Sequence, residues 1–280
     1  MNVLITGARG YLGALLSAAL SGSHDVVRTS RGDISNSLFQ YLDVTDADCV
    51  KRVVAATVPD VIIHAAAMAN LSVCEANPEA AFLVNAEGTL NVVQAANEVG
   101  ARVLFISTLA ASNPSIVYGR SKSAAEEHVK HVRMGHEIVQ LSMTFGLSPN
   151  RASRRPFNKM LESFQTGKPR IYDNAWLFQP TCTEHVIAIV RQLLCRPFEG
   201  RRLAVTVDKR CTMYDIANDL LGPALVKGTA LYRDREVVCI EADHLSRLGL
   251  PTMTYATMLQ RMRIQLLTCA PDGMPNAMPA

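Results

Sequence analysis

The chain has 280 residues, 49% of them apolar and 19% charged, and a formal net charge of +3 at pH 7. These values exclude an intrinsically disordered chain and support a sizeable core, and the basic residues are too scattered to indicate a nucleic-acid partner. The seven cysteines form no C-x-x-C pair, so neither a zinc knuckle nor a disulfide framework is expected, and single thiols in a reducing cytosol are the simpler interpretation.

The first half of the chain alternates short apolar segments with longer amphipathic ones. The pattern predicts strands at 2–6, 25–29, 61–64, 102–107 and 137–143, and helices at 10–20, 46–57, 78–98 and 115–134. Short apolar strands separated by long helices are typical of a parallel sheet covered on both faces. We therefore predict an α/β fold with a doubly wound Rossmann sheet, in which residues 1–150 bind a dinucleotide.

The second half is less regular. Helices are expected at 155–166, 183–195, 212–221 and 254–267, and short strands at 169–172, 203–206 and 236–239. We predict a small α/β substrate-binding lobe at 151–268, interleaved with the edge of the first domain, and a flexible tail at 269–280. The start lacks a signal-like segment and no window is apolar enough to span a membrane, so we expect a cytoplasmic protein without a membrane partner.

A glycine-rich loop lies where the first strand meets the first helix. Its G-x-x-G-x-x-G spacing allows a tight turn and a close approach of backbone N–H groups to a pyrophosphate, beside the positive end of a helix. A glycine-rich turn without a ligand is the alternative. The residues of this loop expected to bind the cofactor are Gly7, Arg9, Gly10, Tyr11, Leu12 and Gly13.

The end of the second strand indicates which dinucleotide binds. An NAD site places a carboxylate there for the ribose 2′-hydroxyl, whereas this chain has Ser30 and Arg31 and no acid before Asp33. A hydroxyl and a guanidinium suit a 2′-phosphate, so we predict that NADP(H) is preferred over NAD(H). Alternatively, Arg28 and Arg31 are solvated surface charges.

A Y-x-x-x-K pattern, Tyr118 and Lys122, follows the fourth strand. The two side chains lie on one face of the predicted helix, and a nearby ammonium lowers the pKa of a phenol. Such a tyrosine can pass a proton to a carbonyl oxygen as hydride arrives at its carbon. Ser107 and Thr108 end the fourth strand, at the sheet edge where ligands bind, and a hydroxyl there can bond the same oxygen.

Together these features resemble an extended short-chain dehydrogenase/reductase. The similarity is carried by the loop at 6–13, Asp43-Val44, the run 64–67, the segment 85–89, Ser107-Thr108 and the Tyr118/Lys122 pair. Within that class the chain is similar to the dTDP-4-dehydrorhamnose reductase branch, through the stretch 65–96 with its Cys74-Glu-Ala-Asn-Pro-Glu motif and the segments 178–181 and 245–250. The resemblance covers about residues 1–265.

The resemblance implies roles for individual residues. Those expected near the cofactor are Asp43 and Val44 at the adenine, Ala65, Ala66 and Ala67 along it, and Asn85, Ser107, Tyr118 and Lys122 close to the reacting end. The catalytic triad would be Thr108, Tyr118 and Lys122. The expected substrate contacts are Met68, Thr108, Trp176, Phe178 and Gln179, with core packing as an equal alternative for Trp176 and Phe178.

The chain departs from that branch in two places. Only nine residues separate Thr108 from Tyr118, where relatives have a longer segment that includes a loop over the sugar. The segment 140–146 lacks the arginine-rich start and the tryptophan usual there. A shorter loop over the substrate predicts either a more open substrate pocket or a ketone substrate that differs from the sugar of that branch.

Several other residues have less specific interpretations. We expect His64 to be a hydrogen-bonded core residue and Cys182 to be packed in the core, with no metal site in the chain. Arg151, Arg154 and Arg155 form a basic loop that is either solvated or a clamp for a substrate anion.

We therefore predict an NADPH-dependent reductase of a small-molecule carbonyl, a ketone or a nucleotide-linked 4-ketosugar, in biosynthesis. The alternatives are a non-catalytic NADP-binding regulatory subunit of another enzyme, and a nucleotide-sugar epimerase or dehydratase. Dehydratases add acids near the tyrosine, whereas Thr108 is followed here by Leu109 and Ala110. The family's dimers suggest a homodimer through helices near 78–99 and 115–134.

Overall fold

The computed structural model describes residues 1–32, 38–149, 155–232, 240–241 and 243–269, and these form two compact units. Unit 1 contains Met1–Leu141 and Ile189–Ala204. Unit 2 contains Ser142–Ala188 and the described residues from Val205 onward. The chain thus leaves unit 1, builds part of unit 2 and returns. Assignment of 1–150 to the cofactor and 151–268 to the substrate stays a prediction.

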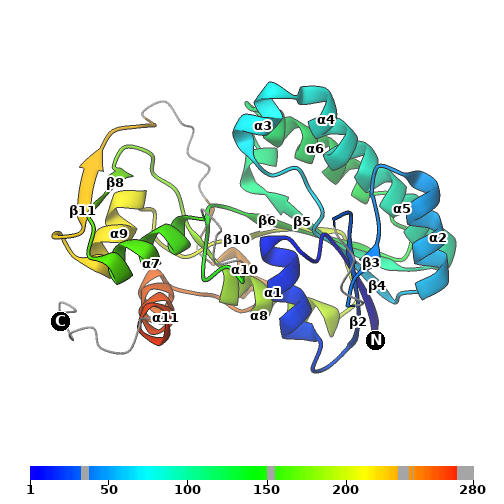
Figure 1. Cartoon of the computed structure of the whole chain (residues 1–280). Helices are drawn as coiled ribbons and strands as arrows, with labels where there is room; N and C mark the ends of the chain where they lie inside the picture. The colour runs from blue at the N-terminus through cyan, green and yellow to red at the C-terminus, as the bar shows by residue number, and fades with distance from the viewer. Residues whose placement is uncertain (33–37, 150–154, 233–239, 242, 270–280) are drawn as a thin grey trace. The chain divides into compact units, whose positions relative to one another are not determined.

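Unit 1 is built on a seven-stranded sheet (Figure 1). Its strands are β1 (Asn2–Thr6), β2 (Asp25–Ser30), β3 (Gln40–Tyr41), β4 (Val61–His64), β5 (Arg102–Thr108), β6 (His136–Leu141) and β10 (Arg201–Val205). The order is β10-β6-β5-β4-β1-β2-β3, and strands β1 to β6 pair in parallel. Because the chain winds outward in both directions from β1 and β4, the predicted doubly wound, Rossmann-like fold is confirmed.

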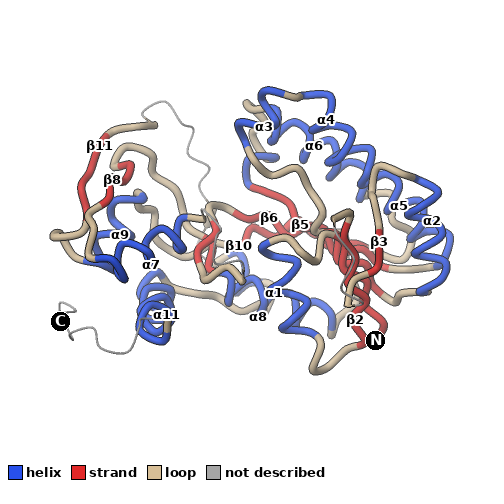
Figure 2. Tube along the Cα trace, viewed as in Figure 1, coloured by secondary structure: helices blue, strands red, loops and turns tan. Residues whose placement is uncertain are grey.

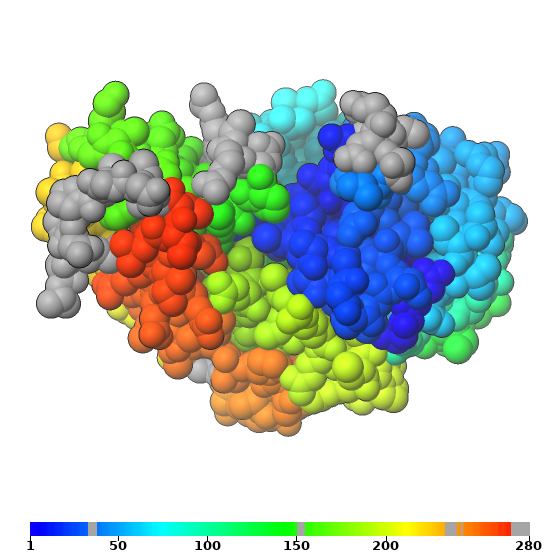
Figure 3. Space-filling model, turned by 60° about the horizontal axis from the view of Figure 1, so that its bottom comes forward, coloured from blue at the N-terminus to red at the C-terminus, as the bar shows by residue number. Residues whose placement is uncertain are grey.

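Helices cover both faces of this sheet (Figure 1). One face carries α2 (Ala47–Thr57), α5 (Gly88–Val99) and α6 (Val117–Val129), whose apolar sides form one core cluster with the strands. The other carries α1 (Tyr11–Leu20) and the end of α8 (Thr183–Leu194), joined where Arg191 Nη2 donates to Ala19 O at 2.6 Å. Figure 3 shows α1 in dark blue beside the yellow-green residues around 190–200. Burial on both faces explains the continuous apolar runs of the strands.

The long helix predicted at 78–98 is interrupted. It consists of α4 (Pro78–Phe82), a π-helical turn (Leu83–Glu87) and α5. Before it lies α3 (Leu71–Ala76), which the periodicity did not predict because six residues are too short a segment to show a helical repeat. A 3₁₀ turn (Leu109–Ala111) also links β5 to α6. All three unpredicted features lie beside the candidate site.

Unit 2 has its own core. Its helices are α7 (Pro156–Thr166), α9 (Met213–Leu221), α10 (His244–Arg247) and α11 (Tyr255–Thr268). Its parallel strand pairs are β8 (Arg170–Asp173) with β11 (Val226–Thr229) (Figure 2), and β7 (Thr144–Phe145) with β9 (Thr181–Cys182). The strand predicted at 203–206 is β10 of the seven-stranded sheet, whereas the one predicted at 236–239 and most of the tail lie outside the described residues. In the described part of the chain, no helix has the length and apolarity needed to cross a membrane.

Candidate functional site

The glycine loop joins β1 to α1 as the sequence predicts. Gly7 has a φ of +65°, and a Cβ there would lie 2.7 Å from the Cα of Ala66 at the end of β4. A side chain at Gly13 would collide with the carbonyl oxygen of Gly7. Glycine is therefore required by both backbone conformation and space. Since α1 starts at Tyr11, its first N–H groups lie at the carboxyl edge of the sheet, where an anion can bind.

A buried hydrogen-bond chain fixes the strand ends beside this loop. Thr6 Oγ1 accepts the N–H groups of Ala65 and Ala66, each at 3.1 Å, so its own proton goes to His64 Nδ1 at 2.7 Å. His64 therefore carries its proton on Nε2 and donates to Thr89 Oγ1 at 3.0 Å. Burial, with the nearby charge of Lys122, lowers the pKa of His64 to about 3, so the ring is neutral. The expectation that His64 is a hydrogen-bonded core residue is confirmed.

Asn85 connects the cofactor edge of the sheet to α6. It lies in the π-helical turn and is 1% exposed. Its Oδ1 accepts the Met68 N–H at 2.8 Å, and its Nδ2 donates to Met68 O at 3.1 Å and to Ser121 Oγ at 2.9 Å. One amide thus holds both the segment that follows β4 and the helix that carries the Y-x-x-x-K pair. π-helical turns are frequent at functional sites because they redirect one side chain.

Lys122 is the most buried cation of the described residues. It is 1% exposed, its Nζ donates to Ile106 O at 2.8 Å, and the same atom lies 3.8 Å from the centroid of the Phe105 ring. Burial lowers its pKa to about 7, while the charge of Glu126 acts to raise it. Tyr118 lies one turn earlier on α6 and is half-buried. The spacing therefore places a perturbed amine and a phenol on one helix face, which is typical of functional sites.

The short connection between Thr108 and Tyr118 packs directly on α6. Thr108 Oγ1 accepts the Ala110 N–H at 3.3 Å and so caps the 3₁₀ turn. A Cβ at Gly119 would lie 2.5 Å from Ala110 O, so this turn presses against the first turn of α6. The compact turn and the missing Cβ explain how nine residues suffice to connect β5 to α6.

The start of α6 is capped from outside its own segment. The cap residue Ile116 offers no side-chain acceptor, and the Val117 N–H instead donates to Glu75 Oε1 of α3 at 2.7 Å. A carboxylate at a helix N-terminus is favourable because of the helix dipole. Sequence reasoning missed this residue because its helix was not predicted, although Glu75 belongs to a motif that carries the family resemblance.

The residues predicted for the adenosine end lie together near the end of β2. Arg31 Nη1 lies 4.0 Å from Asp43 Oδ2, and Arg31 is largely exposed. The Arg9 guanidinium lies 5.3 Å from the centroid of the Phe39 ring. Ser30 is buried at the strand end. Two guanidinium groups and a hydroxyl therefore belong to one edge of unit 1, while Asp33 lies outside the described residues.

The three substrate residues predicted beyond residue 150 belong to unit 2. Phe178 is 3% exposed, and its ring stacks on Phe145 with centroids 6.2 Å apart and lies tilted against Trp176 with centroids 4.8 Å apart. Gln179 accepts the Ile240 N–H at 2.7 Å and donates to Ile240 O at 3.0 Å. Phe178 and Gln179 thus serve the core of unit 2, and their contact with a substrate stays a prediction.

The structure also bears on Cys182, on the expected absence of a metal site and on the basic loop at 151–155. Cys182 is buried, and burial raises the pKa of its thiol, so the expected packing role is confirmed. Within the described ranges, no group of three or more His, Cys, Asp or Glu residues is placed to hold a metal ion. Arg151 and Arg154 of the basic loop lie outside those ranges.

The fold and the site define a Rossmann-like protein with a glycine loop after its first strand and a Tyr-x-x-x-Lys helix after β5. The chain belongs to the RmlD substrate-binding domain family, which it matches over residues 1–247. The predicted resemblance to the dTDP-4-dehydrorhamnose reductase branch is thereby confirmed.

Named relatives agree with this family. The dTDP-4-dehydrorhamnose reductase of Escherichia coli (strain K12) is 30% identical over 238 residues, which is 78% of this chain and 76% of the relative. Methionine adenosyltransferase 2 subunit beta of Xenopus tropicalis is 29% identical over 242 residues, which is 78% of this chain and 72% of the relative. The crystal structure of the Bacillus anthracis dTDP-4-dehydrorhamnose reductase in complex with NADP superposes with a TM-score of 0.78 at 22% identity, covering 94% of this chain and 98% of that one.

Proposed function

We propose that this protein is an NADPH-dependent reductase that transfers hydride to the carbonyl carbon of a nucleotide-linked ketosugar or a related ketone. The observation that carries the proposal is Lys122, a buried cation one helical turn after Tyr118, bonded to the backbone of the strand that ends at Thr108. A buried charge with one protein hydrogen bond is costly to the fold, and such a cost is typical of a catalytic group.

The chain's own residues fit a dinucleotide. The cradle between Gly7 and Ala66, which a Cβ would fill, allows a pyrophosphate to approach the start of α1. A bound nicotinamide supplies the hydride. Lys122 holds the ribose and favours ionisation of Tyr118, Tyr118 gives its phenolic proton to the substrate oxygen, and Thr108 orients that oxygen.

We infer a preference for NADPH from the end of β2. Arg31 and Ser30 offer a guanidinium and a hydroxyl for a 2′-phosphate, and Arg9 adds a second guanidinium. Arg28, the other basic residue on this strand, donates to Ser21 Oγ at 2.6 Å and is therefore engaged elsewhere. Arg31 as a merely solvated charge is the alternative.

The relatives support the substrate class, since the Escherichia coli protein reduces a dTDP-linked ketosugar by its name. The short turn after Thr108 supports a substrate that needs less cover on that side. A second candidate function follows from the Xenopus tropicalis relative, a subunit of another enzyme: a cofactor-bound regulatory subunit without turnover. A nucleotide-sugar epimerase or dehydratase is the further alternative, and the dehydratase has less support, because Leu109 and Ala110 follow Thr108 where a dehydratase would need acids. A homodimer stays a prediction.

The experiment is a fluorescence titration of the purified chain with NADPH and with NADH, followed by a panel of ketones and dTDP-linked and other nucleotide-linked 4-ketosugars. The reductase requires consumption of NADPH with at least one member of the panel, and a fall in turnover of about 10²-fold or more in Tyr118→Phe with unchanged NADPH affinity. Full turnover in Tyr118→Phe would refute the role of that residue. Tight NADPH binding without oxidation, together with co-purification of a larger enzyme, would favour the regulatory subunit.

A further inference from the structure

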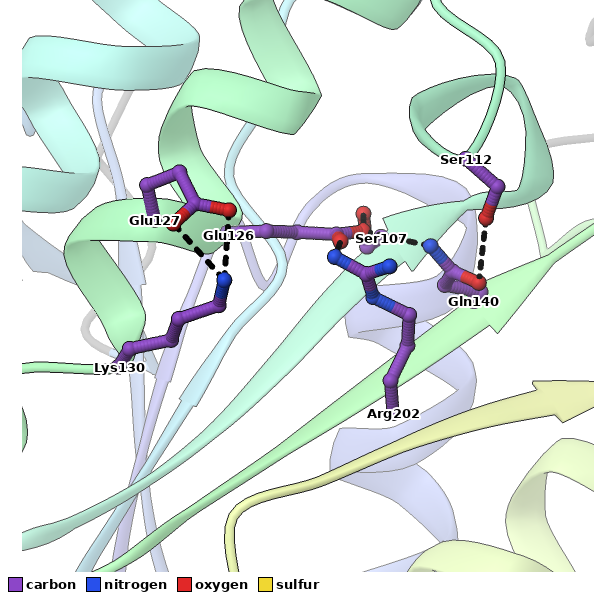
Figure 4. Close-up of polar contacts among 7 residues, drawn as sticks. All are labelled: Ser107, Ser112, Glu126, Glu127, Lys130, Gln140 and Arg202. Atoms are coloured by element: carbon purple, nitrogen blue, oxygen red, sulfur yellow. Dashed lines mark hydrogen bonds and ion pairs between the residues drawn. The ribbon is translucent and has the colours of Figure 1, made fainter.

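Glu126 is a fully buried carboxylate on α6, one helical turn after Lys122. Its Oε1 accepts Ser107 Oγ at 2.5 Å and Gln140 Nε2 at 2.9 Å, and its Oε2 pairs with Arg202 Nη2 at 2.8 Å (Figure 4). A buried charge persists only when it is paired and hydrogen-bonded, and this one has all of these partners. The two hydrogen bonds fix Oε1, and the Arg202 cation faces Oε2, in a carboxylate that the proposed reaction does not use.

The partners of Glu126 come from three neighbouring strands. Ser107 on β5 and Gln140 on β6 are register partners, and Arg202 lies on β10, the next strand in the order. One side chain of α6 thus fastens the helix to all three strands. Arg202 is 43% exposed, so its charge is partly solvated, whereas the carboxylate is not.

This network also encloses the segment that carries Thr108. Ser107 immediately precedes Thr108 and bonds Glu126 directly. Ser112, at the other end of the 3₁₀ turn, donates to Gln140 Oε1 at 3.1 Å, and Gln140 in turn bonds Glu126 (Figure 4). Glu126 therefore helps to fix the position of the Thr108 segment relative to α6, together with the contacts of Lys122 with Ile106 O and of Gly119 with Ala110.

The charge of Glu126 acts on Lys122. Near Lys122 lie Tyr118 on the same helix and His64, whose neutral ring stacks on the Phe105 ring that Lys122 also contacts. Glu75 caps the start of α6 but is exposed. Burial lowers the pKa of Lys122 and the charge on Glu126 opposes that effect, so Glu126 is the buried anion that favours the ammonium.

We propose that Glu126 is a positioning residue of this site: it holds the end of β5 against α6, and its negative charge stabilises the ammonium of Lys122. The inference rests on the proposed function of Lys122. Arg202 moderates the charge of the carboxylate from the edge of the sheet. Loss of Glu126 makes the electrostatic field at Lys122 less favourable to the ammonium, and loss of Arg202 makes it more favourable. A network with a purely structural role would not give opposite effects for the two substitutions.

The test compares Glu126→Gln, Arg202→Gln and the matched control Glu127→Gln. Glu127 is the next residue, and it pairs with Lys130 at 2.7 Å on the exposed side of α6 (Figure 4). NADPH affinity and kcat/KM are measured against pH. In Glu126→Gln we expect the loss of NADPH affinity and of kcat/KM at high pH to begin about one pH unit lower than in the wild type. At pH 8 each quantity should then be about ten-fold lower than in the wild type. In Arg202→Gln the loss of NADPH affinity and of kcat/KM begins at a higher pH than in the wild type. In Glu127→Gln the pH at which this loss begins is unchanged.

The outcomes separate this inference from the proposed function. Equal pH profiles for all three variants would overturn the inference, whatever their stability. If Glu126→Gln fails to fold, Arg202→Gln still decides, because the altered side chain is at the exposed end of the same pair. A wild-type chain that binds NADPH but reduces nothing would refute the reductase, and the pH profile of NADPH affinity would then decide the role of Glu126. Absence of NADPH binding would refute both.

Discussion

Asn85 Nδ2 donates to Ser121 Oγ at 2.9 Å, and that hydroxyl donates to Tyr118 O at 3.0 Å. The π-helical turn is thereby joined to the backbone of the residue proposed as proton donor. Because Asn85 also bonds both main-chain atoms of Met68, a single amide sets the spacing between the β4 end and α6. Rigid support of this kind is what a site needs to hold its reacting groups in place.

We expect Asn85→Ala to destabilise the protein and impair the reaction. The substitution removes the acceptor of the Met68 N–H and one hydrogen bond each from Met68 O and Ser121 Oγ, at a cost of about 1–3 kcal/mol. Urea unfolding measures that loss, and kcat should fall more than NADPH affinity. The control is Asn97→Ala, whose amide bonds only exposed backbone groups of α6's C-terminal connection. Equal effects of the two substitutions would contradict the supporting role of Asn85.

Gly7→Ala should remove NADPH binding and weaken the fold. Alanine at a φ of +65° is strained, and its Cβ meets the backbone of Ala66 at 2.7 Å. We expect a loss of about 1–3 kcal/mol in the free energy of unfolding and more than a ten-fold loss of NADPH affinity. Gly22→Ala serves as the control, because a Cβ at Gly22 meets nothing within 4 Å. Fluorescence titration and thermal unfolding report the two effects, and unchanged NADPH binding in Gly7→Ala would refute the glycine-loop assignment.

Arg31→Ala tests the cofactor preference. If Arg31 binds a 2′-phosphate, its loss weakens NADPH about ten-fold and leaves NADH affinity unchanged. Arg28→Ala removes the same charge three residues earlier, on β2, from a side chain bonded to Ser21, and should change neither affinity. A parallel fall in both affinities for Arg31→Ala would show that the residue acts on the fold or on net charge.

Lys122→Met should stop reduction while it stabilises the fold. The pKa of Lys122 is lowered by burial from 10.5 to about 7, so the unfolded chain binds more protons than the folded chain between these values. The free energy of unfolding therefore rises with pH from about 7 to 10.5 and is lowest below this window. We expect the variant to lose that pH dependence and to gain about 1 kcal/mol or more at pH 7. The exposed substitution Lys130→Met is the control, and a destabilised Lys122→Met would contradict the strain assigned to the buried ammonium.

Asp173 is expected to control the acid stability of unit 2. Burial opposes ionisation of its carboxyl, but N–H donors of Trp176 at 2.8 Å, Leu231 at 2.7 Å and Tyr232 at 3.1 Å outweigh it and lower the pKa. The stability it contributes is present above the pKa of the unfolded chain and is lost as pH falls through the lower folded value.

Asp173→Asn should therefore cost about 1–3 kcal/mol at pH 7 and flatten the decline of stability towards acid. Asp25→Asn, on an exposed position of β2, is the control for the change of charge. Chemical unfolding of both variants at pH 7 and pH 3 distinguishes the specific effect of Asp173 from the general effect of removing one negative charge. If the free energy of unfolding of Asp173→Asn declined towards acid pH as it does in the wild type, the Asp173 carboxylate would be excluded as the cause of that decline.

The sequence by itself determined the parts of the protein that depend on neighbouring residues. Apolar runs flanked by turns located six strands of the main sheet, and the glycine spacing located the loop at Gly7. The spacing of Tyr118 and Lys122 placed them on one helix face, since four residues make about one turn. The same local motifs carried the family resemblance.

Only the tertiary structure decided how these parts are tied together. The partners of Asn85, Glu126 and Val117 lie between 14 residues (Glu126 to Gln140) and 76 residues (Glu126 to Arg202) away in the chain, and no local pattern specifies them. Likewise, the run that became β10 is apolar enough for a strand, but its place beside β6 depends on pairing with a distant segment. Buried polar groups take whichever partners the packed fold brings within hydrogen-bond distance, because leaving them unpaired is costly. The contacts of Glu126 with residues of three strands satisfy that requirement, and they exist only once the sheet is assembled.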